Sequence, residues 1–202
     1  MKLSRLLFFL SMTTACALAA TSGIHGRVAA GPPARTVPGA FAPPPARSVV
    51  WAINSKRPTP THPFAMNQKW MAFQPHVLVV PLGATVVFKN SDTVEHNVNW
   101  RSIGGDRALA KNLGDARPGQ ILQYRFTHPG VVHVRCRLHP TMSAYIVVVP
   151  TPYFTTTKRS GAFRLVLPPG RYRVVAWHEG RAERSREVTV GAAPVAVNFN
   201  LH

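Results

Sequence analysis

Residues 132–142, VHVRCRLHPTM, end a β-branched run with Cys136, His139 and Met142, spaced three residues apart. Alternate residues of a strand point to the same face, so Cys136 shares a face with the two valines before it. If those valines face a core, the thiol of Cys136 emerges at the buried end of the strand. The turn RLHPTM can then bring His139 and Met142 back over the same point. The stretch therefore indicates a metal-ligand loop at the end of a core strand.

A second imidazole would complete a known kind of site. Type 1 copper is bound by two imidazoles and one thiolate in a trigonal plane, with a weak axial thioether. His96 offers the missing imidazole, in the segment KNSDTVEHNVNW that follows the strand pattern ATVVFKN. Because His96 lies far upstream of Cys136, such a site would form only when the fold joins the two segments.

The start of the chain, MKLSR followed by LLFFLSMTTACALAA, has the basic, apolar and small-residue pattern of a secretory signal peptide. We predict a signal peptide at residues 1–20 and a periplasmic mature protein. A second interpretation makes Cys16 the anchor of a lipoprotein, although Thr13 stands where an aliphatic residue is expected. Cys136 then remains without a partner cysteine in an oxidising compartment. It either binds a metal or packs as a small apolar side chain.

The charge of the chain is strongly positive, with 24 Lys and Arg against 7 Asp and Glu and a net charge of +17. The charges are scattered, with no run of five or more of one sign, so a nucleic-acid-binding tail is not indicated. A positive field on an exported protein favours an acidic protein partner or an anionic envelope surface. A compositional bias of the source genome explains the charge equally well. No later segment reaches the length of a transmembrane segment, which needs about 18 apolar residues.

Strand patterns recur along the chain, bounded by Pro, Gly, Asn and Asp, and no stretch has the period of an amphipathic helix. They read GIHGRV, SVVWAI, HVLVV, ATVVFKN, ILQYRF, VVHVRC, AYIVVV, AFRLVL, RYRVVAW, REVTV and VAVNFNL. The Pro-rich residues 31–45 and the polar residues 101–119 are expected to be loops, the second with at most a short helix. The sequence therefore predicts an all-β protein.

The C-terminal part, residues 153–201, resembles the carboxypeptidase regulatory-like (transthyretin-like) β-sandwich. The resemblance rests on the glycine turn before AFRLV and the PPG turn before RYRVV. The family's first two strands are expected upstream, in GIHGRV and ARSVVWAI. This implies a discontinuous sandwich of residues 22–58 plus 151–202, with a domain of residues 59–150 inserted. The alternative is two consecutive domains, with residues 22–58 attached to the first.

The inserted part resembles the cupredoxin family over residues 75–150. EHNVNW and CRLHPTMSAYIVVV match its two ligand segments, with the short Cys-x-x-His-x-x-Met loop of amicyanin. The resemblance implies a Greek-key β-sandwich and one copper ion held by His96, Cys136, His139 and Met142. It also implies that Asn97 ties the two ligand segments together. Pro140, which has no N–H, would leave the sulfur of Cys136 short of one hydrogen-bond donor.

The function that this resemblance implies is one-electron transfer between Cu(II) and Cu(I), without enzymatic activity. His139 would be the exposed residue through which electrons pass. The partner would be a redox protein with an acidic docking surface. Exported bacterial proteins labelled as methylamine-utilisation or plastocyanin-like are similar over nearly the whole mature chain. The alternative function is copper storage, copper sensing or an envelope interaction module. Hydrolytic catalysis is disfavoured because no G-x-S-x-G elbow is present, and no nucleotide-binding fingerprint occurs.

Several residues remain outside the predicted site. Strand parity turns His133 toward solvent, Met66 and Met71 are expected to pack within strands, and His178 is expected to be structural. Four scattered histidines are assigned no role: His25, His62, His76 and His128.

Overall fold

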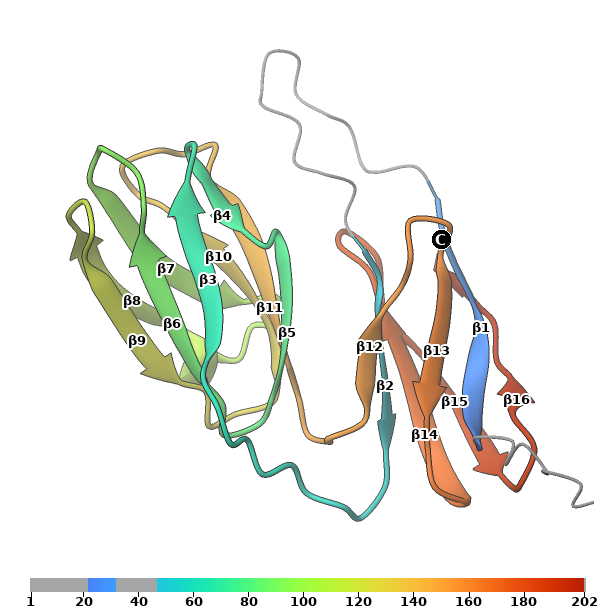
Figure 1. The fold of residues 1–202 in the computed structure, drawn as a ribbon. Coiled ribbons are helices and arrows are strands. Elements are labelled where there is room, and N and C mark those ends of the chain that lie inside the picture. Colours follow the sequence, from blue (N-terminus) through green and yellow to red (C-terminus); the bar gives the residue numbers. More distant parts are fainter. Residues whose placement is uncertain (1–21, 32–46, 202) are drawn as a thin grey trace, which may run out of the picture.

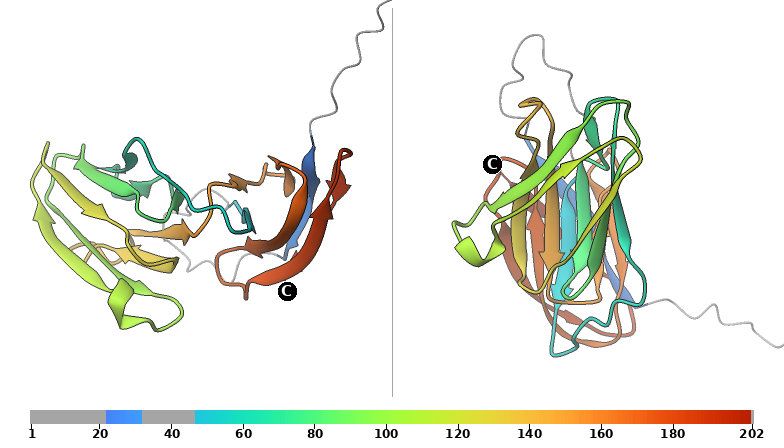
Figure 2. Two further views of the ribbon diagram at one scale, coloured as in Figure 1. Left: turned by 90° about the horizontal axis from the view of Figure 1, so that it is seen from below. Right: turned by 90° about the vertical axis from the view of Figure 1, so that its left-hand side faces the viewer.

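The computed structural model describes residues 22–31 and 47–201. In these ranges the chain forms strands and one short 3-10 helix, so the all-β prediction is confirmed. The strands make four sheets, which pack as two sandwiches lying side by side (Figures 1 and 2). No helix in the described ranges is both long and apolar enough to cross a membrane. The predicted signal peptide, Cys16 and most of the Pro-rich loop lie outside the described residues.

The first sandwich contains the middle of the chain. Its strands are β3 (Phe64–Lys69), β4 (Ala72–Gln74), β5 (Val77–Pro81), β6 (Thr85–Asn90), β7 (His96–Ser102), β8 (Lys111–Ala116), β9 (Ile121–Arg125), β10 (Gly130–Arg135) and β11 (Ser143–Val149). One sheet has the order β4-β3-β6-β9, and the other β5-β11-β10-β7-β8. In the second sheet β5 runs parallel to β11, whereas β10 is antiparallel to both of its neighbours. The two segments predicted to meet at a metal are therefore adjacent strands, β7 and β10.

The core of this sandwich lies between its two sheets and is rich in aromatic side chains. Trp100 from β7 stacks on Phe88 with ring centroids 5.9 Å apart and contacts Phe126 at 5.2 Å. Val134 points into the same core, and Cys136 belongs to the same buried cluster. Because Val134 and Cys136 are two residues apart, the inward parity expected for the cysteine is the observed one.

The polar stretch at residues 101–119 contains more structure than we predicted. After the short helix η1 (Arg107–Leu109) the chain forms β8, which pairs antiparallel with β7 and places Ala116 opposite His96. The prediction of a loop with at most a short helix was wrong for β8. This strand lies at the edge of its sheet and is mostly polar, and its Gly114 has a φ of 93°. It therefore lacks the apolar alternation by which strands are recognised.

The second sandwich combines strands from before and after the first. Its strands are β1 (Gly23–Ala30), β2 (Val49–Ile53), β12 (Phe154–Thr156), β13 (Ala162–Val166), β14 (Gly170–Trp177), β15 (Arg184–Val190), β16 (Val195–Ala196) and β17 (Phe199–Leu201). In one sheet β1 lies between β13 and β16 and also pairs with β17. In the other sheet the order is β12-β2-β14-β15. The boundaries given above for the two domains stay a prediction.

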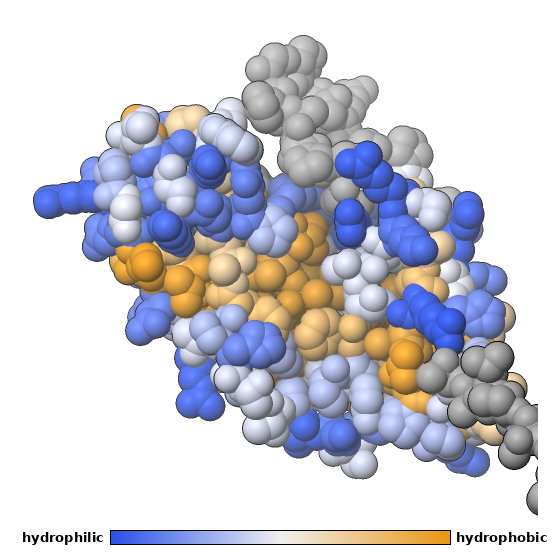
Figure 3. Space-filling model, viewed as in Figure 1, coloured by the Kyte–Doolittle hydropathy of each residue, from blue (hydrophilic) through white to orange (hydrophobic). Residues whose placement is uncertain are grey.

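The two sandwiches meet through apolar side chains on the outer face of the five-stranded sheet. This contact consists of buried valines and tryptophans from β2, β11 and β14: Val49, Trp51, Val147, Val149, Val175 and Trp177. Figure 3 shows apolar surface gathered in the middle of the molecule, where the sandwiches adjoin. Burial of the six side chains of the contact stabilises the arrangement of the two sandwiches by about 25 cal/mol for each Å² of apolar surface removed from water.

A polar bridge adjoins the apolar contact. The Nδ1–H of the buried His76 donates to the carbonyl oxygen of Ser143 at 3.0 Å, and its Nε2 lies 2.6 Å from Oε2 of Glu179. Burial raises the pKa of Glu179, but the hydrogen bond and charge of His76 and the hydrogen bond from Tyr145 bring it below the usual 4.5. Burial and the Glu179 charge raise the pKa of Tyr145 to about 12. Glu179 is therefore ionised near neutral pH and paired across the contact.

The bridge predicts how stability depends on pH. Folding lowers the pKa of Glu179, so its ionised carboxylate contributes fully to the free energy of unfolding above pH 4.5, its usual pKa. This contribution is lost as pH falls through the lower pKa of the folded state. We expect Glu179→Gln to be less stable than the wild type at neutral pH, with the difference shrinking in acid. Urea unfolding over that range measures this difference, with Glu187→Gln on the exposed part of β15 as the control. A difference that stays constant with pH would contradict the prediction.

Candidate metal centre

The predicted ligands lie at one end of the first sandwich. His96 is the first residue of β7, Cys136 follows the last residue of β10, and His139 lies in the turn before β11. The backbone N–H of Asn97 donates to Sγ of Cys136 at 3.2 Å and so joins the two segments directly. His96 and Cys136 are buried, whereas His139 is partly exposed.

Three ligand atoms converge at this end. Nδ1 of His96 lies 3.1 Å from Nδ1 of His139, and Sγ of Cys136 lies 3.7 Å from the same His139 nitrogen. In the part of the chain that the structure describes, these three residues form the one cluster of His, Cys, Asp and Glu able to hold a metal, with ligand atoms within 4.8 Å of one another. A metal that binds nitrogen at ~2.0 Å and sulfur at ~2.3 Å in a trigonal plane separates those atoms by about 3.5–3.7 Å. The distance from sulfur to nitrogen matches this value, and the two nitrogen atoms lie about 0.4 Å closer together than such a metal would hold them.

The protonation of His96 also fits a metal. Its Nε2 lies 2.8 Å from Oδ2 of Asp92, and an ionised carboxylate can only accept, so the proton lies on Nε2. Nδ1 of His96 then presents a lone pair toward Nδ1 of His139. Two facing nitrogen atoms at this distance require a proton or a metal ion between them. A carboxylate behind a histidine ligand is the usual arrangement around a protein-bound metal.

Asp92 also holds the turn between β3 and β4. Its two carboxylate oxygens accept the backbone N–H groups of Trp70 and Met71, each at 2.9 Å. Both turn residues have a φ of 56°, which is rare without glycine, and the carboxylate offsets that strain. Burial raises the pKa of Asp92, but the hydrogen bonds from Met71, His96 and Trp70 bring it below the usual 3.8. Met71 is 44% exposed, so our prediction that it packs within a strand was wrong, while Met66 is fully buried.

A polar network fixes the other side of the site. The side-chain amide of Asn97 donates to Oδ1 of Asp115 at 2.7 Å, and its oxygen accepts from Asn99 at 2.7 Å. Arg137, in the ligand loop, forms an ion pair with Asp115. The hydrogen bonds from Arg137 and Asn97 hold the pKa of Asp115 below its usual value. The network therefore links the loop after Cys136 to strands β7 and β8.

The turn that carries His139 and Met142 is closed by backbone hydrogen bonds. The N–H of Met142 donates to the carbonyl oxygen of His139 at 3.0 Å, and the N–H of Cys136 donates to the Met142 carbonyl at 3.3 Å. The Met142 side chain is buried in the same core cluster as Cys136. Pro140 is exposed and has no N–H to offer. Asn97 supplies the one backbone N–H bond to the Cys136 sulfur within the described ranges.

The other histidines of residues 22–31 and 47–201 are not part of this cluster. His133 lies on the outer face of the sheet, but it is half-buried, stacks on Tyr145 at 4.8 Å and lies 2.7 Å from Oγ of Ser143. The prediction that it faces solvent was thus only partly right. His178 lies 3.0 Å from the Ser48 hydroxyl, and burial lowers its pKa. His76 belongs to the bridge between the sandwiches.

Sequence reasoning missed Asp92, whose only signal is its place four residues before His96 in the polar turn SDTVEH. An aspartate in a turn is ordinarily a turn former. Its contact with the β3–β4 turn joins residues 21 and 22 positions apart, which no local pattern reveals.

Comparison with known families agrees with this geometry. Residues 62–149 match the copper-binding proteins of the plastocyanin/azurin family. The first sandwich is a plastocyanin/azurin-family cupredoxin domain. Residues 130–202 match the carboxypeptidase regulatory-like domain, so the second sandwich is of that kind. The latter match overlaps β10 and β11, which strand pairing places in the cupredoxin sheet.

Solved structures similar to the chain include cupredoxins. A purple cupredoxin from Nitrosopumilus maritimus is 22% identical, with a TM-score of 0.38, over 42% of this chain and 98% of that chain. A reduced Cu(I) form of an amicyanin variant is 20% identical, with a TM-score of 0.39, over 49% and 97% of the two chains. A copper-containing nitrite reductase from Thermus scotoductus is 23% identical, with a TM-score of 0.39, over 48% and 25%. No curated protein matches the chain.

Proposed function

We propose that the cupredoxin domain binds one copper ion at a type 1 site and transfers single electrons. The proposed ligands are His96, Cys136, His139 and Met142. The observation that carries the proposal is the convergence of two imidazole Nδ1 atoms and one thiol sulfur within 4.8 Å of one another. A bound copper ion would supply the Cu(II)/Cu(I) couple, which trigonal His₂Cys sites with a weak thioether support.

The residues around the site would hold the ligands still while an electron passes. Asp92 fixes the ring of His96, and the Asn97 N–H fixes the sulfur of Cys136. Ligands that are held in place before metal binding need little rearrangement between oxidation states. His139 is the partly exposed member of the cluster and follows Leu138, which is 40% exposed, so the proposed point of electron entry and exit is its ring edge.

The proposed setting is the periplasm, after removal of the predicted signal peptide. The full sequence has a net charge of +17, and the predicted signal peptide carries only Lys2 and Arg5 of it. The remaining positive charge favours a redox partner with an acidic docking surface, through long-range attraction that added salt weakens. The role in methylamine utilisation that the sequence resemblance implies stays a prediction. The proposed activity is electron transfer without catalysis of a further reaction.

Voltammetry of the purified mature protein, loaded with one equivalent of Cu(II), tests electron transfer directly. We expect one reversible one-electron wave and rapid electron self-exchange. Tight copper binding without a reversible wave would contradict electron transfer and favour copper storage or sensing. Hydrolytic activity that does not depend on copper and is lost in Cys136→Ser would favour an enzyme instead.

Removing the carboxylate behind His96 is expected to weaken copper binding. Asp92→Ala frees the ring of His96 and takes the acceptor from its Nε2–H. Loss of such a partner typically costs about 10–100-fold in metal affinity. A competition titration with a chelator measures this change, and Asp106→Ala, which removes the cap of η1, serves as the control. Equal affinities for Asp92→Ala and the control would contradict the role given to Asp92.

A further inference from the structure

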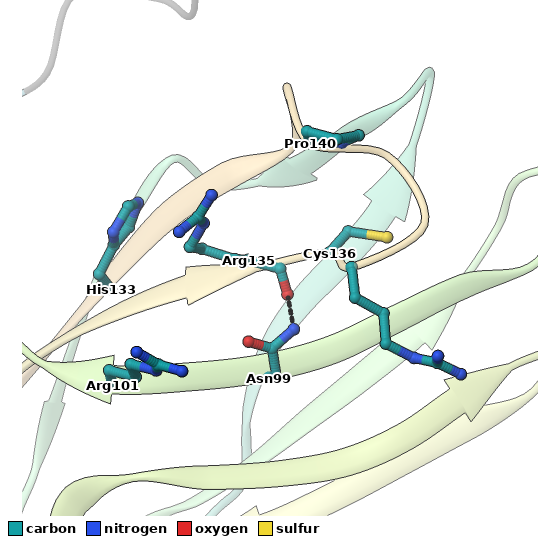
Figure 4. Close-up of a pocket in the computed structure, with 7 residues that line it drawn as sticks. Asn99, Arg101, His133, Arg135, Cys136 and Pro140 are labelled. Carbon is teal, nitrogen blue, oxygen red and sulfur yellow. Dashed lines mark hydrogen bonds between the residues drawn. The ribbon is translucent and has the colours of Figure 1, made fainter.

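An open pocket lies on the outer face of the cupredoxin sheet, directly beside the proposed copper ligand Cys136 (Figure 4). Its lining comes from β7, β10 and the ligand loop: Asn99, Arg101, His133, Arg135, Cys136, Arg137 and Pro140. Elsewhere on the same face, Tyr145 and valines of β5, β10 and β11 pack against the second sandwich. The pocket reaches the ligand loop at Cys136, Arg137 and Pro140.

The strand register explains why basic side chains gather there. Antiparallel pairing sets His133 opposite Arg101 and Arg135 opposite Asn99. Alternate residues share a face, so both members of each pair project outward from the sheet. Figure 4 shows the Arg101 and Arg135 side chains on this side of β7 and β10. Arg101 and Arg135 are therefore diagonal neighbours across the strand pair, and both guanidinium groups add positive charge to the same face.

Arg101 and Arg135 keep their full charge for a ligand. Within residues 22–31 and 47–201, neither guanidinium makes a hydrogen bond or an ion pair, whereas Arg137 is paired with Asp115. Both side chains are exposed, and no acidic residue lines the pocket. Burial and the charge of Arg135 lower the pKa of His133, so its ring is mostly neutral at pH 7. The positive charge therefore comes from arginines with forked N–H groups.

We infer that this pocket docks a carboxylate-rich segment of the redox partner, seated on Arg101 and Arg135. Arginine binds carboxylates in a bidentate manner, which gives orientation as well as attraction. The net charge of +17 would draw an acidic partner toward this surface. Because Cys136 lines the pocket, a segment bound there lies beside the residue that carries the proposed ligand thiol. The identity of the partner as a redox protein rests on the proposed function, whereas recognition of carboxylates does not.

Fluorescence anisotropy with a labelled glutamate-rich peptide tests the inference on the copper-loaded mature protein at low salt. We expect saturable binding, with Arg101→Gln and Arg135→Gln each weakening it about threefold to tenfold, as loss of an exposed or partly desolvated charge pair does. The double substitution should weaken it further. Arg171→Gln, which removes the same charge from an exposed position on β14, should change the affinity less than twofold. Thermal unfolding checks that each variant is folded.

Three outcomes would overturn the inference. The peptide could fail to bind, Arg171→Gln could weaken binding as much as the pocket variants, or the pocket variants could reduce binding to phosphatidylglycerol vesicles while leaving peptide binding unchanged. The last outcome would assign the pocket to a lipid surface. Arginine-dependent peptide binding without a reversible copper wave would support carboxylate docking while the electron-transfer proposal fails. A reversible copper wave without peptide binding would support electron transfer, while the carboxylate-docking inference fails.

Discussion

Replacing Cys136 with serine is expected to abolish the intense visible absorption that we expect Cu(II) to give on binding to the wild-type protein. That absorption arises from charge transfer between a thiolate and Cu(II) in a trigonal site. The Cys136 sulfur lies 3.7 Å from Nδ1 of His139 and accepts the Asn97 N–H, so it is positioned as the thiolate ligand. A serine hydroxyl does not ionise readily and is a harder ligand. Titration with Cu(II), followed by visible spectroscopy, measures the loss.

Met142→Leu is the matched control in the same loop. Leucine preserves most of the buried volume of Met142 and leaves both imidazoles and the thiol in place. We expect the visible band to persist in this variant, with a shifted reduction potential, because the axial ligand tunes the copper couple. A band of wild-type intensity in Cys136→Ser would contradict the assignment of the thiolate.

The second large effect is expected from Trp100→Ala, which should lower the free energy of unfolding of the cupredoxin domain by about 3–5 kcal/mol. Trp100 is 2% exposed and contacts three aromatic rings. The ring centroids lie 5.9 Å away for Phe88, 5.0 Å for Tyr124 and 5.2 Å for Phe126. An alanine would leave a cavity among side chains held from both sheets. Urea unfolding of the copper-free protein measures the change.

Trp70→Ala provides the comparison for the same chemical change at the surface. Trp70 is 68% exposed at the β3–β4 turn, where its ring is approached by the Lys69 side chain. An exposed side chain contributes little to stability, so we expect a change within about 0.5 kcal/mol. Equal destabilisation by both substitutions would show that burial of Trp100 does not dominate the stability of this domain.

Much of the fold could be predicted because its strands are half-buried. Alternation in VVHVRC gave the correct inward parity of Cys136, and the glycine turn before AFRLV is observed at Gly161, whose φ is 80°. Alternation gave no signal for β8, whose exposed edge position needs no apolar face. Met71 was misplaced for a related reason, because the apolar letters around it span a tight turn whose strained backbone is held by a distant carboxylate.

The candidate site was likewise predicted only in part. The sequence placed the histidines, cysteine and methionine in order, and the structure brings His96, Cys136 and His139 together. Of the groups that orient them, Asn97 was expected from the family resemblance, whereas Asp92 was hidden because it acts through its position in the fold and not through its residue type. The pairing of Arg101 with His133 depends on which residues of β7 and β10 lie opposite each other. That register is a property of the folded sheet, and two segments so far apart in sequence do not encode it locally.

The path of the chain between the two sandwiches has a further consequence for protease digestion. The chain crosses twice, from β2 to β3 and from β11 to β12 (Figure 1). Most of the first crossing, residues 54–63, is exposed, whereas in the second the buried Thr151 bonds the Ala52 carbonyl at 2.7 Å. A single cut near Lys56 would therefore divide the polypeptide without separating the sandwiches, because β1 and β2 remain paired with C-terminal strands. The nicked protein would migrate as two fragments in denaturing gels and as one particle in solution.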